Sequence, residues 1–592
     1  MKRIVTLSLI LALGSSVFAQ HLPHALAPQE IPLIPAYRAS RADADRNIHT
    51  PPNFPVRTMA EWEEIQTLCI AWIDYEPILK RIVRYAKDEC EVLIVTDNAA
   101  NVQSILMDNT AGGPLPDLNN ITFLNAPFNT VWMRDYGAEC IYKNDVDSLF
   151  LFDWIYNRPR PADDAVPDAI GAFKNIGVYN TSTPPWDMVG TGGNFMADGA
   201  GTYVGESLFL DENGPPPLGQ YNITIRDELG VDTIMQHFMG IPPSRNIKMT
   251  DLPNDVIHHV DMHMKLIDEE RLLTGSFPIG VSDGPQIETN VQAILNNEVN
   301  CFGQPYKFVR IPMPPSTGGQ YPPFASYRTY ANNVFINKTI LVPTYRTEYD
   351  TTGLRILREA EPGYRIIGID CDDNGANIIA ASGAIHCITK GIGVADPLLI
   401  RHQSLQDTYD TQNPYAVNAY VRHKSGITAA ALYWSTDTTQ AWNSVPMADM
   451  GSNNWSATIP AHPANSTIYY YIEGHANNGK TQVRPIVAPH GWWRFRVLDI
   501  GSAIADPQGP VITDVFPDPC HELMMITLDR VRNERVRIAL FDALGREARL
   551  VQDGPIMSDG RVFVDVGTLA PGTYALVAES ALGRSVVRVE KE

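Results

Sequence analysis

Four short stretches in the first two thirds of the chain carry polar side chains that could act together in catalysis. They are Trp132-Met-Arg-Asp-Tyr-Gly137, His259-Val-Asp261, Thr329-Tyr-Ala-Asn332 and Gly383-Ala-Ile-His-Cys387. Taken singly, each has an ordinary structural explanation, because a His-x-Asp pair is often only hydrogen-bonded and a cysteine after an apolar run is usually only buried. Taken together, they supply a nucleophile, an acid–base group and two carboxylates.

This set of groups fits an attack on a guanidinium carbon, which resists nucleophiles because the group is resonance-stabilised and positively charged. The thiolate of Cys387 is the side-chain nucleophile best matched to it. Asp135 and Asp261 can hold the planar cation through paired hydrogen bonds. His259 can protonate the departing ammonia and later deprotonate the attacking water. We therefore expect a hydrolase that releases ammonia from a guanidino group and needs no metal and no cofactor.

One cluster in the same region also allows a metal site. Its members are His258, His259, Asp261 and His263. If this segment is a strand, the side chains of a His-x-Asp-x-His run share one face and could present three ligands to a metal ion. We favour the metal-free alternative, because Asp135 and Cys387 would have no purpose in a metal centre.

The region from about residue 40 to 400 must position these groups, and in it strand-like and helix-like runs alternate. Apolar runs predict strands at 67–72, 92–96, 147–154, 202–209, 272–274, 333–342 and 376–388, and helix-like runs lie at 77–87, 223–237 and 287–297. On the last strand His386 would face away from Cys387, so we do not expect it to be the base. No glycine-rich phosphate loop opens a helix, so no nucleotide site is predicted.

The ends of the chain have a different character. Lys2 and Arg3 precede an apolar run, and Ala19 offers a small residue for cleavage, which predicts an export signal over residues 1–19. Short alternating runs separated by turn residues predict two all-β sandwich modules at 410–500 and 510–592. No later run is long and apolar enough to suggest a membrane span.

Composition excludes several classes of partner and framework. The net charge of -21 disfavours nucleic acid and anionic membranes as partners. The seven cysteines are odd in number, widely spaced and without a CxxC pair. That pattern disfavours a zinc site and a disulfide-dense scaffold, and it leaves at least one thiol unpaired within the chain.

The four motifs, together with Gly192-Gly-Asn-Phe195 and Asp198-Gly199, occur in the order of the guanidine-modifying pentein superfamily. Within that superfamily the chain resembles secreted bacterial peptidylarginine deiminases, and agmatine deiminases are nearer relatives than the vertebrate enzymes. The resemblance implies an α/β catalytic domain at 40–405, built as a pseudo-fivefold ring of ββαβ units around the active site. It also implies that an immunoglobulin-like sandwich follows at 410–500.

The last module resembles the C-terminal sorting domain of type IX secretion cargo. The matching stretches are Phe516-Pro-Asp-Pro519, Phe541-Asp-Ala-Leu-Gly-Arg546 and Leu569-Ala-Pro-Gly-Thr-Tyr574. The resemblance implies export across both membranes, with the type IX machinery as a partner and the secreted fraction or the outer-membrane surface as the destination.

The family resemblance also implies roles for individual residues. Cys387 matches the nucleophile, His259 the acid–base residue, and Asp135 and Asp261 the carboxylates that bind the guanidinium. Asn332 matches an active-site asparagine, although Asn333 beside it leaves that alignment open by one residue. Two further predictions concern substrate binding. Trp132 is expected to form a wall along the arginine stem, with plain core packing as the alternative. Arg158 and Arg160 are expected to bind a terminal carboxylate, with a proline-rich surface loop of solvated charges as the alternative.

These observations lead to one expected function and two alternatives. We expect hydrolysis of peptidyl arginine, at the C-terminus of peptides or proteins, to citrulline and ammonia through a covalent thiouronium intermediate on Cys387. An agmatine or free-arginine deiminase would use the same catalytic residues, so the chemistry does not separate the two. A secreted binding protein on a non-catalytic pentein scaffold is the alternative of another class.

Overall fold

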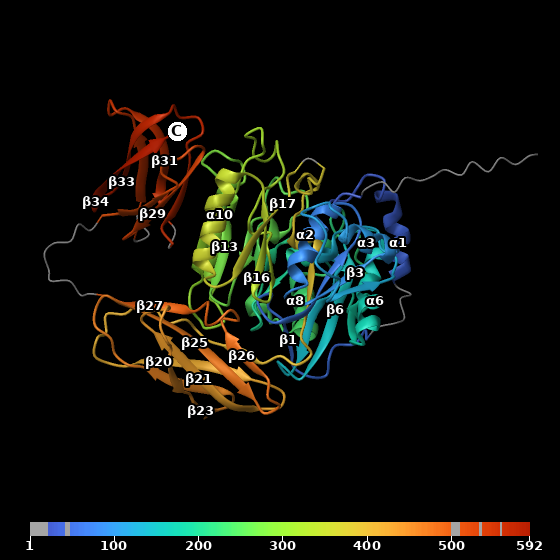
Figure 1. The fold of residues 1–592 in the computed structure, drawn as a ribbon. Coiled ribbons are helices and arrows are strands. Elements are labelled where there is room, and N and C mark those ends of the chain that lie inside the picture. Colours follow the sequence, from blue (N-terminus) through green and yellow to red (C-terminus); the bar gives the residue numbers. More distant parts are fainter. Residues whose placement is uncertain (1–21, 42–47, 374, 499–508, 532–534, 557–558) are drawn as a thin grey trace, which may run out of the picture.

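The computed structural model describes residues 22–41, 48–373, 375–498, 509–531, 535–556 and 559–592. The predicted export signal at 1–19 lies outside the described residues. Figure 1 shows a mixed α/β body in blue to yellow, an all-β module in orange and a second all-β module in red. No helix in the described part of the chain has the length and apolar character needed to cross a membrane.

The α/β body repeats one small arrangement of strands. In each unit an antiparallel pair shares its second strand with a parallel pair, and a helix connects the two parallel strands. One unit consists of β12 (Met264–Leu266), β13 (Arg271–Ser276), α9 (Gly284–Asn297) and β14 (Lys307–Pro312). The next consists of β15 (Val334–Ile336), β16 (Thr339–Thr344), α10 (Thr347–Ala360) and β17 (Arg365–Asp370).

Three more units complete the body. The first joins β18 (Lys390–Gly393), β2 (Ile65–Ala71), α2 (Glu76–Ala86) and β3 (Glu91–Val95), with β4 (Ile121–Leu124) added. The second joins β5 (Glu139–Lys143), β6 (Ser148–Tyr156), α6 (Val166–Lys174) and β7 (Val178–Thr181), flanked by β1 (Val56–Thr58) and β8 (Val189–Gly190). The third joins β9 (Met196–Ala197), β10 (Tyr203–Glu206), α8 (Glu228–Met239) and β11 (Asn246–Met249). Because β18 pairs with β2, the end of the body returns to its beginning, and the predicted pentein architecture is confirmed.

Some predicted elements differ from those in the structure. The expected strand at 376–388 is wrong, because this apolar segment forms the 3-10 turns η5 (Ile379–Ala381) and η6 (His386–Ile388). Its backbone does not join a ladder: the N–H of His386 donates to the carbonyl of Asn332 at 3.2 Å. Periodicity cannot distinguish a buried turn of this kind from a buried strand.

Other predicted boundaries shift for local reasons. The run at 333–342 is a hairpin, not one strand, and it turns at Asn337 with a left-handed φ of 50° that asparagine tolerates. The run at 202–209 leaves the sheet after Glu206 and continues as α7 (Leu208–Asn213). The helix expected from residue 223 begins at Glu228, where the side chain of Asp227 caps it by accepting the N–H of Gly230.

The orange module is a sandwich of two antiparallel sheets. One sheet has the order β19 (Leu399–Arg401), β20 (Tyr415–Arg422), β24 (Asn454–Ile459) and β23 (Ala448–Gly451). The other has the order β22 (Asn443–Pro446), β21 (Ile427–Ser435), β25 (Ser466–Ala476) and β26 (Thr481–Arg484), with β27 (Trp493–Val497) also on β25. Inward-facing residues of both sheets, such as Val417 and Ile468, form one core.

The red module is a second sandwich with its own core, which includes Met524, Ile538 and Leu576. One sheet has the order β28 (Val511–Phe516), β29 (Leu523–Asp529) and β32 (Arg561–Asp565). The other has the order β31 (Glu547–Pro555), β30 (Arg535–Phe541), β33 (Gly572–Ser580) and β34 (Gly583–Lys591). These two modules account for the β-rich remainder of the chain.

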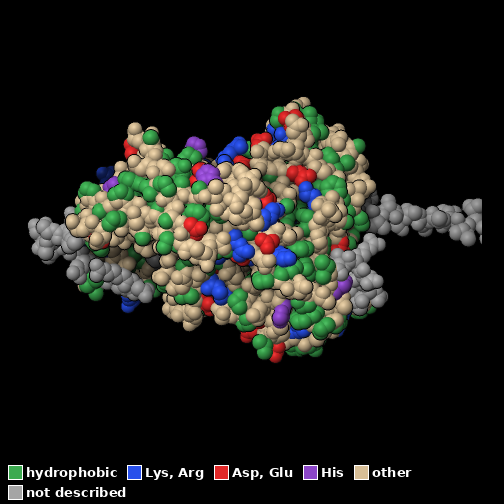
Figure 2. Space-filling view, turned by 90° about the horizontal axis from the view of Figure 1, so that it is seen from below, with side chains coloured by type: hydrophobic (Ala, Val, Ile, Leu, Met, Phe, Trp, Pro, Cys, Tyr) green, Lys and Arg blue, Asp and Glu red, His purple; other side chains and the backbone are tan. Residues whose placement is uncertain are grey.

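Ion pairs link both modules to the α/β body. Arg484 of the orange module contacts Glu269 at 2.8 Å, and Asp514 of the red module contacts Arg355 at 2.7 Å. Figure 2, which views the molecule from below Figure 1, shows acidic and basic side chains interspersed on that face. The face therefore presents no single-sign field of the kind that attracts polyelectrolytes.

Candidate active site

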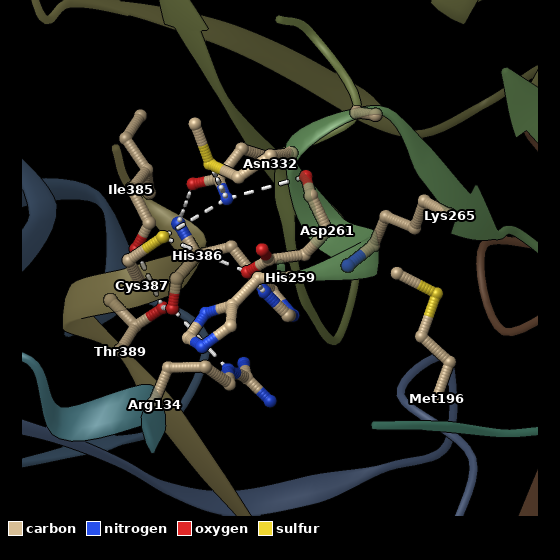
Figure 3. A network of polar contacts seen from close by, with 12 residues as sticks. Arg134, Met196, His259, Asp261, Lys265, Asn332, Ile385, His386, Cys387 and Thr389 are labelled. Carbon is tan, nitrogen blue, oxygen red and sulfur yellow. Dashed lines mark hydrogen bonds and ion pairs between the residues drawn. The ribbon is translucent and has the colours of Figure 1, made fainter. Parts of the chain in front are cut away.

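Cys387 lies in the buried turn η6, and its side chain is inaccessible to solvent. The amide of Asn332 donates to its sulfur at 3.1 Å, and the thiol donates to Oδ2 of Asp261 at 3.6 Å (Figure 3). Burial raises the pKa of the Cys387 thiol well above its usual value, and the nearby carboxylates of Asp261 and Asp135 raise it further. The sulfur is therefore protonated at neutral pH in this arrangement.

His259 directly precedes the 3-10 turn η4 (Val260–Met262), so this segment is not the strand that the metal alternative assumed. Its backbone N–H donates to Asp255 at 3.2 Å, its Nδ1 lies 3.6 Å from Oδ1 of Asp135, and its Nε2 lies 3.4 Å from the hydroxyl of Thr191. Burial lowers the pKa of His259 to about 4, against the opposing effect of Asp135. The ring is therefore neutral at pH 7 and able to accept a proton.

Two ionised carboxylates face this centre. Asp135 lies in the short helix α4 (Met133–Tyr136). Burial alone would raise its pKa, but the neighbouring rings of His24 and His259 outweigh burial and lower it to about 2. The pKa of Asp261 is also lowered despite burial, because His386 donates to its Oδ2 at 2.7 Å. A buried pair of anions is suited to binding a cation.

The choice between neighbouring Asn332 and Asn333 is visible in their contacts. Asn332 donates to the sulfur of Cys387, and its Oδ1 accepts the backbone N–H of His386 at 3.0 Å. Asn333 instead donates to the carbonyl of Tyr330 at 2.8 Å. Asn332 is thus the asparagine that the structure brings to the nucleophile.

His386 is a site residue that the sequence analysis did not identify. It was expected on the opposite face of a strand, but η6 turns its ring toward the site, where it bridges two carboxylates. Its Nδ1 contacts Asp261 at 2.7 Å and its Nε2 contacts Glu61 at 2.6 Å. Glu61 also pairs with Lys265 at 2.7 Å. Because both ring nitrogens are engaged, His386 orients Asp261 and is not available as the base.

Two glycines of the motifs have steric reasons. A Cβ at Gly193 would lie 2.2 Å from Nδ1 of His259, and a Cβ at Gly383 would lie 2.4 Å from the ring of Trp132. Neither separation is possible for carbon. The glycines therefore allow His259 and Trp132 to approach the backbone around the site.

The metal ligand set considered from the sequence is not assembled. The ligand atoms of His259, Asp261 and His263 do not form one group, and His263 instead lies 3.4 Å from Glu206. Within the described residues, two other groups bring three ligand atoms within 4.8 Å of one another. These groups are His24, Asp135 and His259, and Glu206, Asp251 and His258.

The three predicted substrate-binding residues contact the N-terminal segment of the chain. The ring of His24 stacks on Trp132 at 4.1 Å with an interplanar angle of 6°. Arg158 donates to the carbonyl of His24 at 3.2 Å, and Arg160 donates to the carbonyl of Pro23 at 2.7 Å. Nothing in the sequence of this segment indicated that it would lie in the site.

The sequence model for Porphyromonas-type peptidyl-arginine deiminase matches residues 53–392, which is more than half of the chain and contains Asp135, His259 and Cys387. The chain belongs to this family. It is a deiminase of guanidino groups on a pentein scaffold, that is, a hydrolase of amidine C–N bonds.

Individual relatives of the deiminase cover the same region. A Mycoplasma capricolum protein provisionally named agmatine deiminase is 25% identical over 301 residues, covering 46% of this chain and 77% of the relative. A Marinomonas protein with the same provisional name is 23% identical and covers 57% of this chain and 94% of the relative. Among solved structures, a Porphyromonas gingivalis protein provisionally named arginine deiminase is 19% identical, with a TM-score of 0.48 over 57% of this chain and 98% of that one. A C. jejuni agmatine deiminase is 21% identical, with a TM-score of 0.45 over 57% of this chain and 96% of that one.

Proposed function

We propose that this deiminase acts on arginine in peptides, with a preference for C-terminal arginine, and converts it to citrulline with release of ammonia. One observation carries the proposal: Arg158 and Arg160 contact main-chain carbonyls and a carboxylate of the peptide segment whose His24 is bonded to Asp135. Arg160 binds Glu30 through both of its carboxylate oxygens, at 2.7 and 3.0 Å. A substrate's terminal carboxylate would suit the same forked donor.

In the proposed first half-reaction, the guanidinium lies between Asp135 and Asp261 with its carbon facing the sulfur of Cys387. His259 accepts the thiol proton, and the thiolate adds to the guanidinium carbon. The same proton then passes from His259 to the departing nitrogen, so the C–N bond breaks and ammonia leaves. The product of this half-reaction is a thiouronium linked to Cys387.

In the second half-reaction, water replaces ammonia in the pocket. His259 takes a proton from the water while the water oxygen adds to the thiouronium carbon. The C–S bond then breaks as the sulfur takes the proton held by His259, the added hydroxyl loses its remaining proton to solvent, and the neutral ureido group of citrulline is released. No step requires a group that the chain itself lacks.

The charge at the pocket bears on the alternative substrates. Agmatine carries a second ammonium group where peptidyl arginine carries its main chain. Arg158 and Arg160 would repel that ammonium, whereas carbonyl oxygens and a carboxylate attract them. The alternative of agmatine is therefore disfavoured by the two arginines, although the catalytic groups alone would accept it.

A comparison of peptide substrates tests the proposal. Ureido product would be measured from peptides with a free C-terminal arginine, from their amidated forms, from agmatine and from free arginine. The chains would carry His24→Ala, because the ring of His24 stacks on Trp132 and is hydrogen-bonded to Asp135 in the folded chain. Amidation should cost about 1.5–3 kcal/mol in kcat/KM, the scale for a hydrogen bond to a charged group.

Two variants make this comparison specific. Arg160→Ala should remove most of the difference between free and amidated peptides, whereas the exposed Arg535→Ala should preserve it. If the chain that keeps Arg158 and Arg160 turned over free and amidated peptides at equal rates, these two arginines would be excluded from substrate binding. A higher kcat/KM for agmatine than for peptides would favour the alternative substrate.

We also propose that the deiminase is exported and meets its substrates outside the cell or on the outer-membrane surface, with the type IX machinery as its partner. The supporting features are the Lys2-Arg3 and apolar leader and the sorting-domain motifs in the last module. Cell fractionation of a producing strain would test this, and retention of the full chain in the cytoplasm would contradict it.

A further inference from the structure

We infer that residues 22–30 are a peptide ligand of this chain's own active site, with His24 in the place of the substrate arginine, and that they keep the full chain latent. This inference rests on the proposed function, because it takes the pocket around Asp135 and Cys387 to be the substrate site. The occupant is named by the structure: it is the segment that Trp132, Arg158 and Arg160 contact.

His24 makes the contacts expected of a substrate head group. Its flat ring lies parallel on Trp132, its Nε2 is hydrogen-bonded to Asp135, and its Nδ1 lies 2.7 Å from the carbonyl of Ser382. Its ring also meets that of His259 edge-on at 5.0 Å. An imidazole shares with guanidinium a planar shape and in-plane N–H donors, so it fits the same partners. The carbon between its ring nitrogens belongs to an aromatic ring and carries no exocyclic amino group that could leave as ammonia, so the ring can bind without being consumed.

The main chain around His24 is held where the substrate's main chain is proposed to lie. Arg158 and Arg160 donate to the carbonyls of His24 and Pro23, and Trp132 donates to the carbonyl of Leu22 at 3.4 Å. These bonds use peptide groups, which every sequence has. They therefore describe a site for a peptide and not only for a free amino acid.

The segment is anchored on both sides of its turn. Glu30 pairs with Arg160 and also accepts the backbone N–H of Ala27 at 2.8 Å. After η1 (Ile31–Leu33), the helix α1 (Ile34–Arg41) follows. Two buried residues of this helix, Ile34 and Tyr37, share a small core with Ile155, Val189 and Tyr221 of the body. A tethered ligand has a high effective concentration, so added substrate competes poorly with it.

The catalytic groups are closed to solvent while His24 contacts Asp135 and His259. His24, Cys387 and Asp261 have no exposed surface, and His259 and Asp135 are 1% exposed. A substrate guanidinium needs Asp135, whose Oδ2 is already bonded to His24. Catalysis therefore requires that the segment leave the pocket.

Full-length variants test this inference. His24→Ala should accelerate alkylation of Cys387 by iodoacetamide and increase kcat/KM on an arginine peptide, each by about 10²-fold, the lower end of the scale for a tethered ligand. Gln29→Ala, in the same segment but exposed, should behave as the wild type. Alkylation at Cys387 would be read by peptide mapping, and unchanged circular dichroism would show that the fold is intact.

A peptide added to the variant gives a second measure. The nonapeptide Leu-Pro-His-Ala-Leu-Ala-Pro-Gln-Glu, which repeats residues 22–30, should inhibit the His24→Ala chain competitively. The same peptide with alanine at its third position should not. Equal alkylation and equal activity of wild type and His24→Ala would overturn the inference while leaving the proposed function intact. Faster alkylation of His24→Ala without any ureido product would do the reverse.

Discussion

Cys387 is a thiol and His259 a neutral imidazole in the closed site, because burial raises the pKa of the first well above its usual value and lowers that of the second to about 4. Asp261 and Asp135 add to the effect on the thiol. A guanidinium cation between the two carboxylates would offset their negative charge. The thiolate would then form as the substrate binds, with His259 as the proton acceptor.

A serine substitution tests the role of the nucleophile. In the His24→Ala chain, Cys387→Ser should abolish ureido production, because a serine hydroxyl at this position has no adjacent base strong enough to activate it. A haloacetamidine should alkylate Cys387 in the parent and leave the variant unlabelled. Cys301→Ser, at a partly exposed thiol, should retain parental activity. If Cys387→Ser kept a tenth of the rate of the His24→Ala chain, the covalent mechanism would be wrong. If the His24→Ala chain itself formed no ureido product, the result would favour a non-catalytic scaffold.

At the scale of elements, short turns rather than strands present the catalytic groups. Cys387 lies in η6, His259 directly before η4, and Gly193 in η2 (Gly192–Asn194). Each turn follows or precedes a strand of a repeated unit, so the rigid sheets fix the ends of the turns while the turns direct side chains inward. Close packing between turns makes their glycines sensitive to substitution.

Gly193→Ala should therefore impair catalysis more than folding. Its Cβ would lie 2.2 Å from Nδ1 of His259 and 3.0 Å from Oδ1 of Asp135, so the ring must move. We expect kcat to fall by about 10²-fold, the scale for misplacing a catalytic group by an ångström. Gly284→Ala, whose Cβ meets only Phe277 at 3.7 Å at the start of α9, is the matched control and should keep full activity. Parental kcat in Gly193→Ala would show that His259 tolerates displacement.

The whole molecule contains histidines that are buried in the neutral form. Burial lowers the pKa of His259, His263 and His402 to about 4 each. The unfolded chain binds protons at these residues near pH 6.5, so between pH 6.5 and 4 it holds more protons than the folded chain. The contribution of these histidines to the free energy of unfolding is therefore fully present above pH 6.5 and is lost progressively as the pH falls toward 4.

His402 allows this pH dependence to be measured away from the active site. Its Nδ1 bonds to the carbonyl of Asn418 at 2.6 Å and its Nε2 to the hydroxyl of Tyr470 at 3.0 Å, within the orange module. Between pH 7 and pH 5, the free energy of unfolding of wild type should lose about 2 kcal/mol through this one residue. In His402→Gln, the decrease in the free energy of unfolding between pH 7 and pH 5 should be smaller by about 2 kcal/mol, as measured by urea unfolding at both pH values. The exposed His490→Gln should show the wild-type dependence, and an unchanged slope in His402→Gln would refute the assignment.

Metal dependence is also a property of the whole molecule. We expect the ureido-forming activity of the His24→Ala chain to survive exhaustive chelation, because the mechanism uses only the thiol, the imidazole and the two carboxylates. Activity would be measured before and after EDTA, with calcium and zinc added back. Loss in EDTA with recovery in either metal would contradict the metal-free mechanism, and Asp251→Asn would then test the group formed by Glu206, Asp251 and His258.

The sequence alone determined the chemistry and the order of the parts. Residue types and motif order indicated Cys387, His259, Asp135 and Asp261 together, and alternation of apolar runs indicated an α/β body followed by β modules. The fold could be inferred because strands and helices leave local periodic patterns, and the residue types indicate a chemistry because reactivity depends on the identity of side chains.

Only the tertiary structure decided how the groups meet and what occupies the site. The apolar segment around 386–388 was predicted as a strand because buried turns and buried strands are both apolar. Only the contact of Asn332 with the backbone of His386 shows that the ring of His386 turns toward Asp261. The place of His24 depends on a contact with Asp135 across 111 residues. Such a contact leaves no periodic signal in either segment, because it is made by two side chains and not by a repeated face.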